Sequence, residues 1–117
     1  SEGQVTNDNI VDNFEVVDFE ITGKTPINDG EYEYTYITTL KNIGSTTWCD
    51  SGGHWYGLEI EHDNHGYIVQ LGNNKVLPGG TFTSESYFNS SPGEKCYIAM
   101  TNSIMGKFGT PVEFVCE

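Results

Sequence analysis

The chain has 117 residues, 36% of them hydrophobic, and its formal net charge is −12 because it carries 17 Asp and Glu but only 5 Lys and Arg. The length suits one domain, and 7 Tyr and 6 Phe can supply a modest core. The charge argues against nucleic acid or an anionic membrane surface as a partner, since both need clustered cations. No apolar run approaches the ~20 residues of a membrane helix, so membrane insertion is not expected.

In chain order, a polar segment comes first and strands follow. We expect residues 1–13 to form a polar linker and residues 14–117 a single domain. From Phe14 onward apolar and polar residues alternate, which is typical of half-buried strands, and no helical period with a cap occurs. Seven strands are predicted, at Phe14–Thr22, Tyr32–Asn42, Tyr56–His62, Tyr67–Gly72, Thr81–Phe88, Lys95–Asn102 and Thr110–Cys116.

Turn residues separate these segments. Thr25-Pro26 and Asn28-Asp29-Gly30 are expected to divide the first two strands, and Asp63-Asn64-His65-Gly66 predicts a tight hairpin between the third and fourth. Pro78-Gly79-Gly80 and Ser91-Pro92-Gly93 precede the fifth and sixth. Many short strands with regular turns predict an all-β fold, a seven-stranded antiparallel immunoglobulin-like β-sandwich with Greek-key connections.

The order of these signals is similar to that of a known family. A long alternating strand ends in Leu40-Lys41-Asn42-Ile43-Gly44, and later strands follow Leu77-Pro78-Gly79-Gly80 and Pro92-Gly93. From Phe14 to Asn102 the chain resembles the cell-adhesion-related domain of bacteria and archaea, an immunoglobulin-like family often found in tandem on secreted proteins. The resemblance implies an accessory or adhesive module without catalytic residues. The chain departs from the family in Cys49 and in the aromatic insert Trp48–Tyr56.

Three cysteines are present, and none forms the Cys-X-X-Cys spacing of a zinc site. A hairpin centred on Gly106 would place Cys96 opposite Cys116, Ile98 opposite Phe114 and Met100 opposite Val112. This register favours a Cys96–Cys116 disulfide, which would imply an oxidising compartment and leave Cys49 unpaired. A bond from Cys49 to either of the other cysteines, or three reduced thiols, are the alternatives.

The aromatic loop between the second and third strands is the candidate ligand site. Loops at the ends of a sandwich often bind ligands, and aromatic rings can stack on sugar rings while Asp and His bond to hydroxyls. The alternative is that a tryptophan closes the end of the core. The candidate ligand-binding residues are Trp48, Asp50, His54, Trp55 and Tyr56.

The sequence contains few motifs that would indicate a metal site or a catalytic site. Asp29, Asp50, Asp63 and Glu94 lie near turns, but no EF-hand spacing occurs, so calcium is a minor alternative and no cofactor is expected. The histidines at 54, 62 and 65 are interpreted as turn residues rather than metal ligands. No serine has a nucleophile motif, so the protein is expected not to be an enzyme.

Three functions remain in view. The first is a monomeric, non-catalytic extracellular adhesion or interaction module of a larger secreted or surface protein, with a protein or polysaccharide ligand. The second is a carbohydrate-binding module that uses the loop Trp48–Gly57. The third is an enzyme fragment or enzyme inhibitor in which a loop such as Asn102–Thr110 enters a partner.

Overall fold

The computed structural model describes residues 12–63 and 65–117. That part of the chain is all-β, with antiparallel pairing throughout and no helix, as predicted. Its strands are β1 (Phe14–Asn28), β2 (Glu31–Asn42), β3 (Trp48–Cys49), β4 (Tyr56–His62), β5 (His65–Gln70), β6 (Lys75–Val76), β7 (Thr81–Ser90), β8 (Lys95–Asn102) and β9 (Gly106–Val115).

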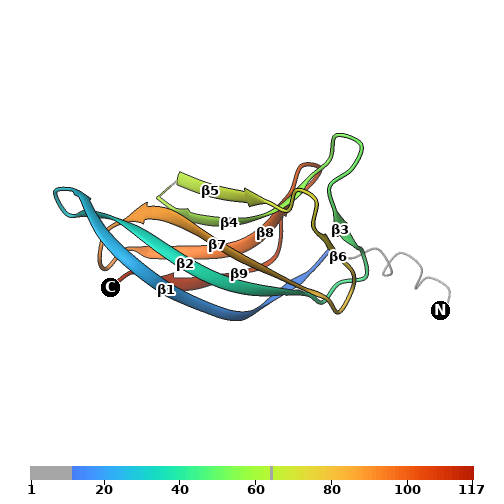
Figure 1. Ribbon diagram of the computed structural model, residues 1–117, viewed down its shortest axis with the longest axis horizontal. Coiled ribbons are helices and arrows are strands. Elements are labelled where there is room, and N and C mark those ends of the chain that lie inside the picture. The colour runs from blue at the N-terminus through green and yellow to red at the C-terminus, as the bar shows by residue number, and fades with distance from the viewer. Residues whose placement is uncertain (1–11, 64) are drawn as a thin grey trace.

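Two main sheets enclose a common core, and Figure 1 shows them lying one over the other. One sheet has the order β1-β2-β7 and the other β5-β4-β8-β9. The seven predicted strands all occur in these sheets. The predicted total is wrong in the described part, because β3 and β6 add a short two-stranded sheet at one end.

Alternation in the sequence decides which side chains fill the core. In β2 Tyr34, Tyr36 and Leu40 are buried, while Thr35, Ile37 and Thr39 between them lie on the outer, half-buried face. The rings of the two tyrosines therefore belong to the core. Their rings lie 5.4 Å and 6.0 Å from the ring of Phe88 on β7.

The two sheets meet through aromatic rings. Phe88 also contacts Phe114 of β9 at 5.8 Å and Tyr67 of β5 at 6.5 Å, so this one side chain packs against both edges of the opposite sheet. Nearer β3, the core is completed by Trp48 and Phe108, whose rings lie 6.1 Å apart. Offset and edge-on ring contacts of this kind add to the stabilisation that comes from burial.

Three predicted boundaries need correction. Thr25-Pro26 is not a turn, because β1 continues to Asn28 along an edge of its sheet, where a proline is tolerated. The last strand begins at Gly106 rather than Thr110. Of the predicted linker, residues 1–11 lie outside the described part, whereas Asp12 and Asn13 pack against the domain and are half-buried.

The predicted register of the last hairpin is wrong, because its turn lies earlier than expected: Asn102 pairs with Gly106 and Met100 with Phe108 instead of Val112. A bulge in β9 offsets part of this error, so Cys96 lies opposite Phe114 and Ile98 opposite Val112, each two residues from its predicted partner. Between Phe108 and Val112 the bulge places three residues against the single Ala99 of β8. Gly109 begins the bulge with a positive φ of 72°, and a side chain there would meet the ring of Phe14 at 2.8 Å.

Within residues 12–63 and 65–117, no helix is long and apolar enough to cross a membrane.

Candidate functional site

The aromatic loop leads from β3 into β4 at the end of the molecule where β3 and β6 lie (Figure 1). Its tip is a tight turn in which Ser51 and His54 exchange backbone hydrogen bonds of 3.0 Å and 2.9 Å. Gly52 and Gly53 both have positive φ, 61° and 85°, which is the backbone of a type I′ turn. The loop is therefore a small structured hairpin.

Trp48 is not a ligand-binding residue, and the prediction of that role is wrong. Its side chain is 0% exposed and packs on Phe108, so neither face of the indole can meet a ligand. Its Nε1 is buried without a hydrogen-bond acceptor among the described residues. The alternative interpretation, in which a tryptophan closes the end of the core, is the one that the structure bears out for Trp48.

Asp50 fixes the shape of the loop. Its Oδ1 accepts a 2.8 Å hydrogen bond from the backbone N–H of Tyr56, and its Oδ2 accepts a 3.2 Å bond from the N–H of Gly72. Both carboxylate oxygens thus bind main-chain donors, one from its own loop and one from the connection after β5. A carboxylate with these partners positions neighbouring backbone, and neither oxygen is left without a donor.

Tyr56 is half-buried and links the loop to the start of the domain. Its ring lies edge-on to Phe108, 6.0 Å away, and its hydroxyl donates a 3.1 Å hydrogen bond to Oδ1 of Asp12. Asp12 also accepts hydrogen bonds from Thr46 Oγ1 and Asn102 Nδ2. Burial and then the Asp12 carboxylate raise the pKa of Tyr56. Its hydroxyl is therefore already engaged within the protein.

Trp55 and His54 remain at the surface, and a second turn joins them there. Trp55 is half-buried, and its backbone N–H and C=O bond to Oγ and N–H of Ser103, each at 3.0 Å. This pair of bonds holds the β8–β9 turn against the aromatic loop. On that turn Ile104 and Met105 are 69% and 72% exposed. We call the surface formed by His54, Trp55, Ile104 and Met105 the loop tip.

The loop tip is only partly the predicted site. His54 and Trp55 belong to the predicted site, and the loop Asn102–Thr110 was predicted only as one that could enter a partner. The missed signal is the pair Ile104-Met105, two apolar residues placed between the turn residues Asn102-Ser103 and Gly106. Asn102 forms the turn, because its Oδ1 accepts hydrogen bonds from the N–H groups of both Ile104 and Met105.

A polar cluster lies at the other end of the core. His62 is 6% exposed, and its Nδ1 lies 3.1 Å from Oε2 of Glu94, at ion-pair distance but without an aligned hydrogen bond. Glu94 Oε1 accepts hydrogen bonds from Ser90 Oγ at 2.7 Å and Ser91 N–H at 3.2 Å. The hydrogen bond from Ser90 is the main cause that lowers the pKa of Glu94, and His62 adds to it.

The candidate metal ligands do not converge. Glu94 is bound to the serines and His62, and Asp50 to main-chain donors. The rings of His62 and His65 lie 5.8 Å apart across the β4–β5 turn, whereas His54 belongs to the loop tip. In residues 12–63 and 65–117, no group of three or more His, Cys, Asp or Glu side chains is placed to hold a metal ion.

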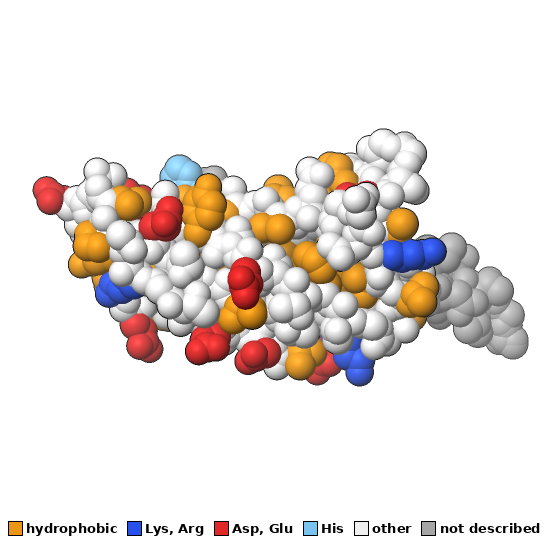
Figure 2. Space-filling model, viewed as in Figure 1, with side chains coloured by type: hydrophobic (Ala, Val, Ile, Leu, Met, Phe, Trp, Pro, Cys, Tyr) orange, Lys and Arg blue, Asp and Glu red, His pale blue; other side chains and the backbone are white. Residues whose placement is uncertain are grey.

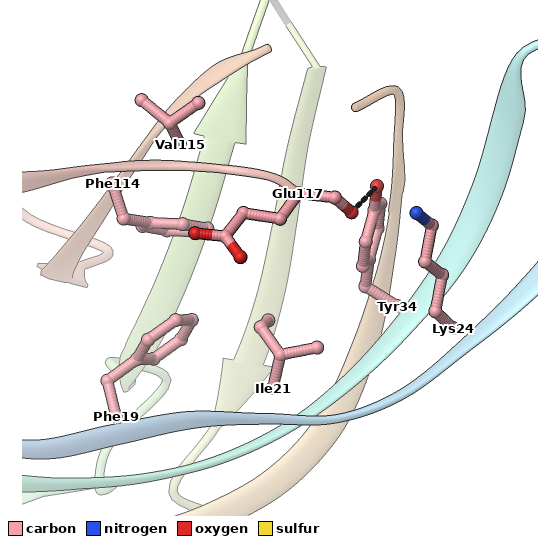
Figure 3. A pocket seen from close by; sticks show the side chains of 7 residues that line it. All are labelled: Phe19, Ile21, Lys24, Tyr34, Phe114, Val115 and Glu117. Atoms are coloured by element: carbon pink, nitrogen blue, oxygen red, sulfur yellow. Dashed lines mark hydrogen bonds between the residues drawn. The ribbon is translucent and has the colours of Figure 1, made fainter. Parts of the chain in front are cut away.

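Two hollows lie away from the loop tip. A groove of about 340 Å³ opens between β1 and β9, where Phe19 and Ile21 face Phe114 and Glu117 (Figure 3). The hydroxyl of Tyr34 donates a 3.3 Å hydrogen bond to the backbone oxygen of Glu117 beside it. A second, shallower hollow of about 520 Å³ lies on the β1-β2-β7 sheet and is lined by Thr22, Glu33, Thr35, Tyr36, Glu85, Ser86 and Tyr87.

The hollow on the sheet owes its shape to a bulge in β1. The register of β1 against β2 shifts between Ile21 and Gly23, and Thr22 Oγ1 lies 3.0 Å from Thr35 Oγ1. A side chain at Gly23 would meet that Thr35 hydroxyl at 2.6 Å. Tyr87, directly opposite Thr35, is 53% exposed. Sequence alternation places Glu85 and Tyr87 on one face, but it does not reveal the bulge beside them.

Charge is distributed unevenly over the surface. Figure 2 shows acidic side chains spread along one long face, with basic side chains towards its ends. Two of the five cations are engaged by glutamates: Lys107 pairs with Glu61, and Lys95 lies 3.9 Å from Glu113. A third, Lys24, lies over the ring of Tyr32 at 4.5 Å. The surface is therefore strongly acidic with few free cations.

Comparison with known proteins gives little further information. The chain matches no protein-family model and no curated protein. Two solved chains match, and one of them is the "X-ray structure of Northeast Structural Genomics Consortium target SoR45". It is 15% identical, with 97% of this chain and 85% of that chain covered and a TM-score of 0.42. A likeness at this level carries no argument about function.

Proposed function

We propose that the chain is a non-catalytic extracellular interaction module of a larger secreted or surface protein, and that it binds a protein partner through the loop tip. The observation that carries the proposal is the exposure of Ile104 and Met105, 69% and 72%, on a turn hydrogen-bonded to the neighbouring aromatic loop. Exposed apolar side chains grouped on structured loops are typical of contact surfaces.

The composition of the loop tip supports a protein partner. Interface centres are enriched in Met and aromatic residues and depleted in charged ones, and Trp55, Ile104 and Met105 meet that description. Asp50 and Asn102 hold the two turns in shape through backbone donors, so little ordering remains to be done on binding. The net charge of −12 disfavours nucleic acid as the partner.

The proposal includes an immunoglobulin-like sandwich with Greek-key connections and a resemblance to the cell-adhesion-related domain. It is supported by the way the chain alternates between sheets: β2 leads across to β4, β5 back to β7, and β7 across to β8. In such a scaffold the two sheets hold the loops at each end in fixed positions. The module would act as a monomer, presenting its loop tip.

A pair of matched variants tests the loop tip. Ile104→Ser with Met105→Ser removes its apolar side chains, whereas Val112→Ser with Val115→Ser changes two exposed apolar residues of β9 by the same chemistry. Proteins of the parent cell surface would be cross-linked to each full-length variant and identified by mass spectrometry. We expect a partner that the wild type and the β9 variant retain and the tip variant loses. Equal recovery by both variants contradicts the proposal.

A second function, polysaccharide binding, is favoured by the hollow on the β1-β2-β7 sheet. Its volume of about 520 Å³ lies within the usual range for ligand sites. Tyr87 offers an exposed ring for stacking, and Glu33 and Glu85 offer acceptors for sugar hydroxyls. In this second proposal the sugar lies on the sheet rather than on the loop Trp48–Gly57, because Trp48 is buried and Tyr56 is bound to Asp12.

Calorimetric titration with soluble polysaccharides tests this second function. Tyr87→Ala should weaken binding about 5- to 100-fold, if a stacked sugar contributes about the 1–3 kcal/mol that a nucleic-acid base contributes on an aromatic ring. Tyr97→Ala is the control, because Tyr97 is 37% exposed on the other sheet. If Tyr97→Ala weakens binding as much as Tyr87→Ala does, the hollow is not the site.

A further inference from the structure

Two buried cysteines lie close together at the end of the molecule opposite the loop tip. Cys96 and Cys116 are 0% and 3% exposed, and their sulfurs lie 3.5 Å apart as thiols in hydrogen-bond contact. The predicted hairpin register does not produce this contact, because Cys96 pairs with Phe114 in the sheet. The chain instead turns inward after β9 ends at Val115.

Backbone hydrogen bonds hold Cys116 in this position. Its N–H donates to the carbonyl of Glu94 at 3.0 Å, and its carbonyl accepts from Gly93 N–H at 2.7 Å. The turn before β8 thus binds the end of the chain on both sides. A disulfide has an S–S length of about 2.05 Å, so the sulfurs must approach by roughly 1.5 Å. Cys116 lies beyond the last strand, where a shift of this size breaks no sheet pairing.

We propose that Cys96 and Cys116 form a reversible intramolecular disulfide when the protein meets a thiol oxidant such as glutathione disulfide, and that the bond clamps the chain end to β8. The inference does not rest on the proposed function. The bond closes a loop between residues 20 positions apart. It fixes Val115 and Glu117, which form one wall of the groove between β1 and β9 (Figure 3).

The exchange proceeds in two steps that balance. The Cys116 thiol loses its proton and its sulfur attacks glutathione disulfide, which releases one glutathione and leaves the other bound to Cys116. The Cys96 sulfur, also deprotonated, then attacks Cys116 and expels the second glutathione. The two protein thiols lose two protons and two electrons in all, and both pass to glutathione disulfide, which becomes two glutathione thiols.

The surroundings of the two thiols determine which one attacks glutathione disulfide first. Cys116 lies beyond the last strand, whereas Cys96 lies on β8 inside its sheet, so local opening exposes Cys116 first. Burial raises the pKa of Cys96 to about 12, although Ser90 opposes this shift, so Cys96 is a poor first nucleophile in the folded protein. We therefore expect slow oxidation of the native protein and fast oxidation once the segment after β9 detaches from the turn before β8.

Cys49 cannot compete within the folded chain. It lies on β3, which Figure 1 shows at the end of the molecule away from the C-terminus. It pairs with Lys75 in the short sheet, and its thiol lies 3.7 Å from the carbonyl of Asp50. The predicted alternatives in which Cys49 bonds to Cys96 or Cys116 therefore do not fit the fold.

The test equilibrates the full-length protein with glutathione disulfide, then denatures it, alkylates it with iodoacetamide and measures its intact mass. With three thiols in the reduced protein, the oxidised protein should take up a single label, on Cys49. Cys49→Ala should then take up none, and dithiothreitol should restore both lost labels. Three labels after oxidation, a lasting glutathione adduct on Cys116, or a bond that includes Cys49 overturns the proposal.

Thermal unfolding tests whether the disulfide, once formed, stabilises the fold as a clamp would. Cys49→Ala should unfold at a temperature roughly 5 °C or more higher when oxidised than when reduced. Cys49→Ala with Cys116→Ser should show the same temperature in both conditions. A bond that forms without raising the unfolding temperature contradicts the clamp. If the serine variant fails to fold, the labels and temperatures of Cys49→Ala alone decide the outcome.

Discussion

At the scale of single residues, two tryptophans of the same insert have different environments. Trp48 and Trp55 are seven positions apart in one aromatic insert, yet Trp48 is fully buried and Trp55 is half-buried. Apolar and polar residues do not alternate regularly between the two tryptophans, because the tight turn Ser51–His54 lies between them. The sequence therefore predicts that aromatic residues lie at one end of the domain. Which of the two tryptophans is exposed depends on the pairing of β3 with β6, which the sequence does not reveal.

Glu94 shows how one carboxylate couples the fold to pH. Its pKa is lowered from 4.5 by the hydrogen bond from Ser90 and by His62, so the folded state favours the charged form. A lowered folded-state pKa contributes stability that is present above the unfolded value and lost as pH falls through the folded value. Acid below about pH 4.5 should therefore weaken the contacts between the β8 turn and His62.

Glu94→Gln tests this coupling. At pH 7 the variant should lose about 1–3 kcal/mol of unfolding free energy, because an amide is a weaker acceptor for Ser90 and leaves His62 without its anion. The loss should shrink from pH 7 towards pH 3, as the wild-type carboxyl becomes protonated in its turn. Urea unfolding at both pH values measures it. A difference that stays constant between pH 7 and pH 3 would show that the charge of Glu94 is not involved.

At the scale of the elements, periodicity predicts strands well where both neighbours in a sheet are fixed. β2, β4 and β8 lie inside the sheets or between long partners, and their predicted bounds match to within one residue. Edge elements deviate more: β1 runs six residues further than expected and β9 begins four residues earlier. Edge strands are less constrained by neighbours, so turn residues such as Pro26 do not end them.

The β4–β5 pair offers an element-scale prediction. A side chain at Gly57 would meet the backbone oxygen of Val69 at 2.8 Å, whereas one at Gly66 would meet only the movable carboxylate of Glu59. Gly57→Ala should therefore cost about 1–3 kcal/mol and Gly66→Ala less than about 1 kcal/mol. Urea unfolding of both variants compares them. A larger loss at Gly66 would mean that Glu59 cannot swing away.

At the scale of the whole molecule, alternation along the chain and its regular turn residues predict an all-β domain. The net charge of −12 predicts only that nucleic acid is not the partner. The Cys96–Cys116 contact was predicted from a hairpin register that the fold does not have, and only the fold shows that Cys116 meets Cys96 from beyond the strand. Contacts between segments distant in the sequence, such as Asp12 with Tyr56 and Asn102, likewise leave no local signal.

The two halves of the molecule thus have separate tasks in our proposals. The loop tip, at the end with β3 and β6, carries the proposed contact with a partner, and the cysteine pair at the opposite end carries the proposed clamp (Figure 1). Since no side chain belongs to both, the tip variants and the cysteine variants should act independently, as expected for sites without shared contacts. Either proposal can therefore fail without the other.

The prolines of β1 and β9 have a consequence for behaviour at high concentration. Pro26 and Pro111 lie in the two long strands that form the outer edges of their sheets. Each removes a backbone donor from an edge on which a second chain would otherwise add as a new strand, and the β9 bulge interrupts the same row again. Together with mutual repulsion between acidic surfaces, these interruptions protect a strand-rich chain from edge-to-edge aggregation.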